Sequence, residues 1–145
     1  MFIRRLLLIT ALVGLSIGCG GEFPTANVSG RVTVNGKPVE KVSVMFQPIA
    51  SEGKVNSGVG SYGITDADGH YTLKLIGKET RGAIIGKHKV MFENYTEPGD
   101  TSDDRPKKKQ TAPAVKIPSR FYYNPKEFEV PRGGTDKADF DLTVP

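Results

Sequence analysis

The sequence predicts an all-β fold, namely an antiparallel Greek-key β-sandwich of about seven strands. Several short segments of the 145-residue chain alternate apolar and polar residues with a period of two, as strands with one buried face do. Turn-forming Gly, Asn, Asp and Pro residues separate these segments, and no stretch after residue 27 has the apolar spacing of a helix. A helix is expected only in residues 1 to 18.

The first predicted strand covers residues 28 to 34, where every second side chain is small or apolar. Asn35-Gly36 follows, and because a type I′ turn needs positive φ at both central residues, this dipeptide predicts a hairpin. The next strand runs over residues 39 to 47 and ends at Pro48. The side chains expected to face inward here are Val28, Gly30, Val32, Val34, Val42, Val44 and Phe46.

A second hairpin is predicted from residues 59 to 65 and 70 to 76, joined by a turn at Asp66-Ala67-Asp68-Gly69. A strand near residues 87 to 95 follows, and the proline-rich residues 96 to 118 are expected to form a mobile loop. Strands near residues 128 to 130 and 138 to 144 close the chain. The inward side chains expected in these segments are Tyr62, Ile64, Tyr71, Leu73, Leu75, Val90, Phe92, Ala138, Phe140, Leu142 and Val144.

The N-terminal residues have the build of a secretory signal peptide. Arg4 and Arg5 precede an apolar run over residues 6 to 17, which is shorter than the roughly 20 residues of a membrane-spanning helix. Leu-Ser-Ile-Gly-Cys at residues 15 to 19 then resembles the lipobox of bacterial lipoproteins, although that family prefers leucine where this chain has Ser16. In the family the cysteine is acylated and becomes the first residue of the mature chain.

The resemblance implies a lipoprotein signal peptide over residues 1 to 18, a lipid on Cys19 and a lipidated tether over residues 19 to 27. A transmembrane anchor or a plain secretory signal is the alternative, but an unpaired cysteine would be unusual in a secreted protein. Residue 20 is Gly, whereas aspartate at that position often retains such lipoproteins at the inner membrane. The expected location is therefore the cell envelope, with the outer membrane favoured.

The charge balance argues against a nucleic-acid partner. Losing Arg4 and Arg5 from the 20 Lys and Arg residues leaves 18 basic against 16 acidic residues, which is close to neutral. With Cys19 as the only cysteine, the domain has no disulfide and depends on apolar burial. The expected partners are the membrane, through the lipid, and an envelope polysaccharide or protein, and the sequence leaves the oligomeric state open.

Three motifs of the predicted domain resemble the carboxypeptidase regulatory-like domain, a transthyretin-like sandwich. They are Val-Ser-Gly-Arg-Val-Thr-Val-Asn-Gly-Lys-Pro-Val at residues 28 to 39, Gly-Ile-Thr-Asp-Ala-Asp-Gly-His-Tyr-Thr-Leu at residues 63 to 73 and Gly-Lys-His-Lys-Val at residues 86 to 90. The resemblance implies one such domain over residues 28 to 145. In metallocarboxypeptidases this domain is an accessory and the zinc ligands lie in a separate catalytic domain, so a non-catalytic role without metal or cofactor is expected.

Several motifs within the domain have an ordinary structural interpretation. Residues 58 to 63 fit GxGxxG but lead into a strand, and Asp66-Ala67-Asp68-Gly69 lacks the later ligands of a calcium loop. His70 and His88, the only histidines, are too few for a zinc site and are expected in surface or edge positions. A basic run at residues 107 to 109 is expected to be solvated.

The densest aromatic cluster is the candidate binding site. Arg120, Phe121, Tyr122 and Tyr123 could stack on sugar rings or anchor a partner, although such residues more often close the end of a core. The leading hypothesis is a membrane-anchored structural or binding module, and carbohydrate recognition by this cluster is the alternative. A transthyretin-like hydrolase, in which His70 or His88 would lie beside a cation in a cleft, is less favoured.

Overall fold

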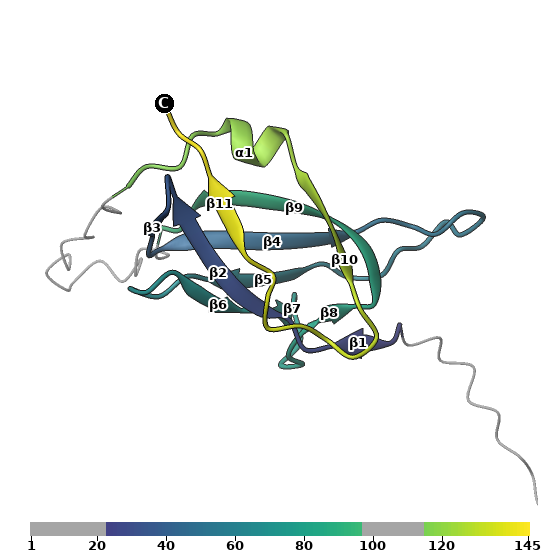
Figure 1. Cartoon of the computed structure of the whole chain (residues 1–145). Coiled ribbons are helices and arrows are strands. Elements are labelled where there is room, and N and C mark those ends of the chain that lie inside the picture. Colours follow the sequence, from purple (N-terminus) through teal and green to yellow (C-terminus); the bar gives the residue numbers. More distant parts are fainter. Residues whose placement is uncertain (1–22, 97–114) are drawn as a thin grey trace, which may run out of the picture.

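The fold is all-β and is built from two main sheets that pack face to face (Figure 1). The structure is a computed structural model that describes residues 23–96 and 115–145. The predicted signal peptide, Cys19 and most of the predicted loop at 96–118 therefore lie outside the described residues.

The first sheet contains five antiparallel strands in the order β10-β9-β4-β5-β7. These strands are β4 (Val42–Pro48), β5 (Ser61–Ile64), β7 (Lys74–Leu75), β9 (Gly86–Asn94) and β10 (Lys126–Val130). The longest pairing joins β4 to β9 over seven residue pairs, from Val42 opposite Asn94 to Pro48 opposite His88. The middle of this sheet forms one wall of the core.

The second sheet is built around β2 (Ser29–Val34). Its partners are β3 (Lys37–Pro38) and β6 (His70–Thr72), which run antiparallel to β2, and β11 (Phe140–Leu142), which runs parallel to it. A short third pair joins β1 (Thr25–Ala26) to β8 (Ala83–Ile84). The parallel pairing arises because the chain crosses from β10 in one sheet to β11 in the other instead of returning through a hairpin.

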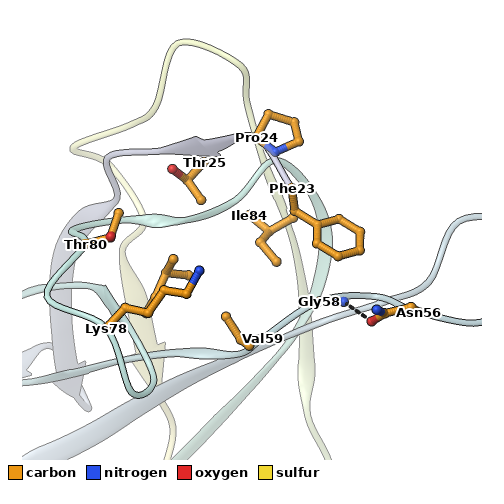
Figure 2. A pocket seen from close by; sticks show the side chains of 10 residues that line it. Phe23, Pro24, Thr25, Asn56, Gly58, Val59, Lys78, Thr80 and Ile84 are labelled. Carbon is orange, nitrogen blue, oxygen red and sulfur yellow. Dashed lines mark hydrogen bonds between the residues drawn. The ribbon is translucent and has the colours of Figure 1, made fainter. Parts of the chain in front are cut away.

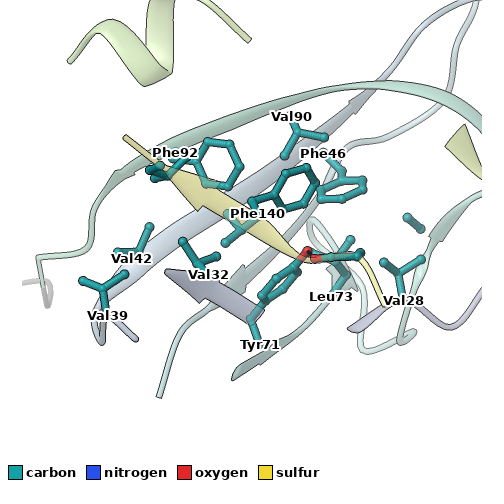
Figure 3. Packing of buried hydrophobic residues seen from close by; sticks show 14 of the residues in the cluster. Val28, Val32, Val39, Val42, Phe46, Tyr71, Leu73, Val90, Phe92 and Phe140 are labelled. Atoms are coloured by element: carbon teal, nitrogen blue, oxygen red, sulfur yellow. Dashed lines mark hydrogen bonds between the residues drawn. The ribbon is translucent and has the colours of Figure 1, made fainter. Parts of the chain in front are cut away.

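The core lies between the sheets and contains a cluster of aromatic rings among aliphatic side chains (Figure 3). Phe140 of β11 packs edge-to-face against Phe92, Phe128 and Phe46, with ring centroids 5.1, 5.8 and 6.2 Å away. Such tilted arrangements are preferred for aromatic pairs because the ring edge is positive and the ring face is negative. The aliphatic residues that complete this layer include Val28, Val32, Val42, Val44, Leu73, Val90 and Leu142, all buried.

The first hairpin has the predicted turn but a shorter second strand. Asn35 and Gly36 both have positive φ, 49° and 78°, as a type I′ turn requires. The predicted strand over 39–47 is instead interrupted: β3 ends at Pro38, Lys41 has φ of 58°, and β4 begins at Val42 in the other sheet. The chain thus uses residues 39–41 to cross between sheets.

Three other local predictions are wrong in detail. In the hairpin predicted from residues 59–65 and 70–76, only β7 pairs with β5, whereas β6 pairs with β2 in the second sheet. On β5 the buried residues are Ser61 and Gly63, whereas Tyr62 and Ile64 are half-buried. Ser61 lies opposite Phe46, which faces the core, and residues opposite each other in a ladder point to the same side. The third error concerns helices, since the described chain contains the four-residue helix α1 (Arg120–Tyr123) where no helix was expected.

The C-terminal strand is fastened to the first hairpin by side-chain hydrogen bonds. The amide of Asn35 donates to the Val144 carbonyl (2.9 Å) and accepts from the Val144 N–H (3.0 Å). The Asp141 carboxylate accepts from the Thr33 hydroxyl (2.6 Å) and the Gly36 N–H (2.9 Å). The Thr33 hydrogen bond, followed by that of Gly36, holds the pKa of Asp141 below its usual value.

Gly30 allows the C-terminal segment to approach β2 closely. A Cβ atom at this position would lie 2.0 Å from the Ala138 carbonyl oxygen. That oxygen accepts a hydrogen bond from the buried Tyr71 hydroxyl (2.6 Å), and the Ala138 N–H donates to the Ser29 carbonyl (3.1 Å). The Ala138 backbone therefore cannot move away from a new side chain without breaking these bonds.

Gly30→Ala is expected to lower the free energy of unfolding by about 2 kcal/mol or more, since the added methyl group overpacks a fixed backbone contact. Denaturant titration of both proteins would measure this change. Gly133→Ala is the matched control, because no atom lies within 4 Å of a Cβ there, and it should change stability by less than about 0.5 kcal/mol. Equal effects of the two substitutions would contradict the proposed close contact.

Candidate functional site

The predicted aromatic cluster forms the short helix α1 at one end of the sandwich (Figure 1). The aromatic residues of α1 differ in their exposure to solvent. Phe121 is half-buried and packs against the core, whereas Tyr122 and Tyr123 are 39% and 75% exposed. The two tyrosine rings meet edge-to-face, with centroids 5.4 Å apart and planes at 86°. The structure thus separates one core residue from two exposed aromatic side chains.

Arg120 is exposed but is tied to the C-terminal segment. Its guanidinium Nη2 donates to the Thr143 carbonyl (2.6 Å), and its Cζ lies 4.9 Å from the centroid of the Phe121 ring. Through these contacts, Arg120 holds α1 against the residues that follow β11. The exposed aromatic surface of α1 is formed by the two tyrosines instead.

The side chain of Asn94, at the end of β9, holds the segment before α1. Its amide Nδ2 donates to the Ile117 carbonyl (3.0 Å), and its Oδ1 accepts from the Ile117 N–H (2.8 Å). This pair of bonds imitates the pairing of two strands, although Asn94 supplies them from a side chain. Ile117 is buried in the core cluster, and the Pro118 carbonyl accepts from the Phe121 N–H (3.1 Å) where the chain enters α1.

A groove of about 750 Å³ lies between the end of β9 and α1. Tyr122 and Tyr123 form its aromatic side, and Glu93 and Lys116 contribute charged groups. A surface that combines exposed aromatic rings with a few polar groups is suited to an amphipathic ligand. Sequence reasoning identified the tyrosines but missed Glu93, Asn94 and Lys116, which carry no motif.

A second cavity of about 550 Å³ lies at the other end of the sandwich, where the described chain begins (Figure 2). Phe23 and Ile84 line it on one side, and Val59 and Lys78 line it on another. The ring of Phe23 comes close to Gly58, where the backbone has φ of 84°. The GxGxxG sequence at residues 58–63 therefore forms part of this wall and leads into β5, not into a helix.

Residues 24–26, which the sequence assigns to the tether, are paired with the domain. The Pro24 carbonyl accepts from the Ile85 N–H (2.9 Å), and β1 pairs Thr25 with Ile84 and Ala26 with Ala83. Ala26 is buried in the core cluster. Two-residue strands have no periodicity, so the sequence pattern could not distinguish them from a tether.

The Asp66 carboxylate has the role of a turn residue. Its Oδ1 accepts from the N–H groups of Asp68 and His70, each at 2.9 Å, and Gly69 has the positive φ that closes the turn. These bonds are the Asx-turn chemistry favoured at such positions. Within residues 23–96 and 115–145, no group of three or more His, Cys, Asp or Glu side chains is placed to hold a metal ion.

The two histidines differ in environment. His70 is exposed on β6 and lies opposite Arg31 across the β2–β6 ladder. His88 is only 1% exposed, which contradicts its expected surface or edge position. The reason is that His88 has the same strand parity as the inward residues Val90 and Phe92 on β9. Its ring packs against Phe46 at a centroid distance of 5.7 Å.

The buried His88 ring is held in one neutral form. Nδ1 lies 2.9 Å from the Gly86 carbonyl oxygen, and because a carbonyl only accepts, Nδ1 carries the proton. Nε2 is buried and has no hydrogen-bond partner among the described residues. Burial holds the pKa of His88 below its usual value of 6.5, against a smaller opposing effect of the Gly86 carbonyl.

None of the helices in the described part of the chain is long and apolar enough to cross a membrane. No family model, curated protein or solved structure matches the chain.

The low pKa of His88 predicts a stability loss in mild acid. Because the unfolded chain binds a proton near pH 6.5 and the folded chain does so only at lower pH, stability should fall as the pH drops below 6.5. Urea titrations between pH 7.5 and pH 5 would measure this dependence in the wild type and in His88→Met, which keeps an apolar group of similar size but cannot titrate. The variant should show a smaller loss over this range.

His70→Gln is the control for that experiment, since it removes the other histidine, which is exposed on β6, and leaves the buried ring of His88 in place. An identical pH dependence in the wild type and in His88→Met would mean that His88 is not the titrating group.

Proposed function

We propose that the chain is an envelope lipoprotein in which acylated Cys19 anchors a non-catalytic structural or binding module. The sequence of residues 1–19 supports this proposal through its resemblance to a lipoprotein signal. The main structural support is the short stretch of chain between Cys19 and the folded domain. Four peptide steps separate Cys19 from Phe23, and pairing with β8 begins at Thr25. A lipid on Cys19 would therefore hold the folded sandwich close to the membrane surface.

The anchoring chemistry follows from the acyl chains. Each buried methylene contributes roughly 0.8 kcal/mol, so more than one chain makes release from a membrane slow. Gly20, in place of the aspartate associated with inner-membrane retention, favours the outer membrane as the destination. The domain itself then needs no membrane-spanning segment.

Cys19→Ala is expected to abolish lipid anchoring, because no acyl acceptor remains at that position. The variant should then appear either in the soluble fraction or as a precursor that keeps its signal peptide. Fractionation of cells that express each form, followed by immunoblotting, would measure the distribution. Ser16→Leu is the matched control, since it brings the signal closer to the lipoprotein pattern and should stay in the membrane fraction. A Cys19→Ala protein that remains mature and equally membrane-bound would refute the proposed anchor.

Carbohydrate recognition at the α1 groove is the second candidate function. It is favoured by the 75% exposure of Tyr123 beside Tyr122, in a groove that also contains Glu93 and Lys116. Tyrosine rings offer flat apolar faces to the C–H groups of a sugar, and nearby charged groups accept or donate hydrogen bonds to its hydroxyls. An envelope polysaccharide has both kinds of surface.

A transthyretin-like hydrolase is the less favoured alternative. The described surface offers only His70, opposite Arg31 on an exposed strand pair, as a histidine beside a cation. Neither residue lines either of the two cavities described above.

Tyr123→Ala is expected to weaken binding of an envelope polysaccharide by about tenfold, because losing an aromatic contact of about 1.4 kcal/mol corresponds to that factor. A glycan array with the protein lacking residues 1 to 18 would identify the ligand, and isothermal titration would measure the affinities. Tyr62→Ala is the control, since Tyr62 lies on β5 away from the groove. Array-wide absence of binding, or equal loss in both variants, would rule out this function.

A further inference from the structure

The end of the sandwich where the described chain begins has an unusual concentration of exposed aliphatic side chains. Within residues 23–96 and 115–145, the exposed large hydrophobic residues are Val55, Val59 and Ile76, apart from the two tyrosines of α1. Val59 and Ile76 are 42% and 51% exposed, and Val55 is fully exposed. We define these three residues together with Phe23 as the proximal patch.

Phe23, Val59 and Ile76 of the proximal patch lie beside one another, and Val55 precedes them in the loop that leads to the cavity. Phe23 and Val59 line the same cavity, and Asn56, which follows Val55 in the chain, lines it with them (Figure 2). The Ile76 N–H donates to the Gly60 carbonyl (2.9 Å), which places Ile76 beside the residue that follows Val59. The patch thus combines the loop before β5, the end of β7 and the first described residue.

We propose that the proximal patch is a membrane-contact surface that rests on the bilayer holding the Cys19 lipid. This proposal depends on the proposed lipid anchor and adds an orientation to it. Four peptide steps reach at most about 14 Å, so an acylated Cys19 keeps Phe23 within that distance of the head groups. Exposed apolar side chains gain free energy when they leave water for the interfacial region of a bilayer.

Tethering makes a small patch sufficient for contact. A surface held close to its target by a short linker binds at a high effective concentration, so weak contacts become populated. The four side chains of the patch are all apolar. The contact is therefore apolar in origin and should persist at high salt.

The opposite end of the molecule would then point away from the bilayer. β9 begins at Gly86, next to the Ile85–Pro24 contact, and ends at Asn94, next to the Ile117 contact. Its nine residues separate the two ends by roughly 25 Å at about 3.3 Å per residue. Helix α1 lies far from β1 and β8 (Figure 1), and it carries Tyr122 and Tyr123, which line the groove.

Site-specific fluorescence quenching in vesicles tests this orientation. Acylation leaves no free thiol in the lipoprotein, so Val55→Cys, Val59→Cys and Tyr123→Cys each introduce one thiol for a nitrobenzoxadiazole label. The labelled full-length lipoproteins are reconstituted into phosphatidylcholine and phosphatidylglycerol vesicles that contain a lipid with a nitroxide near the head group. Val55 and Tyr123 are well exposed, so these two variants should fold as the wild type does.

Labels at positions 55 and 59 should be quenched at least about twofold more than a label at position 123, because apolar contact surfaces lie within about 5–10 Å of the head-group boundary. The difference should remain in 1 M salt. Equal quenching at the three positions, or stronger quenching at 123, in protein that floats with the vesicles would overturn the orientation and leave the anchor intact. Protein that does not float with the vesicles would overturn both proposals.

Discussion

The sandwich depends on the docking of residues 135–144 against β2. This contact joins residues more than one hundred positions apart. It combines the parallel β11–β2 ladder with hydrogen bonds from four side chains that reach across it, those of Thr33, Asn35, Asp139 and Asp141. Asp139 accepts from the Arg31 N–H at 2.8 Å. Phe140 brings the central aromatic ring of the core with it, so loss of this segment would expose the rings that it covers.

The same docking organises the candidate binding groove. Arg120 at the start of α1 donates to the Thr143 carbonyl, and Lys126 at the start of β10 donates to the Asp141 carbonyl at 3.2 Å. Together with the Asn94–Ile117 contact, these bonds attach α1 to both sheets. The exposed tyrosines are therefore presented from a rigid support, which lowers the entropic cost of ordering them when a ligand binds.

The all-β class and most of the core could be predicted from the sequence because they depend on local patterns. Two such patterns are the period of two in residues 28–34 and the preference of Asn35-Gly36 for positive φ. Each depends only on neighbouring residues, and the structure confirms both. The parity of Val90 and Phe92 also contained the signal for the burial of His88, although the polar character of histidine suggested a surface position. In that case the strand pattern outweighed side-chain polarity.

The remaining features depend on contacts that no local pattern encodes. The β1–β8 pair is too short to show a period, and the path from β10 to β11 is set by packing between sheets. For the candidate site, aromatic density identified residues 121–123, but the four-residue helix decides that Phe121 packs inward while the tyrosines face outward. The groove also needs Asn94, whose contact with Ile117 bridges distant parts of the chain.

The proposed function requires a lipid on Cys19 that holds this sandwich at a membrane. The most direct measurement is mass spectrometry of the N-terminal peptide of the protein purified from membranes. The mature chain is expected to begin at Cys19 and to carry the mass of acyl groups on that residue. A mature chain that begins at another residue, or that contains Cys19 without acyl groups, would contradict this expectation.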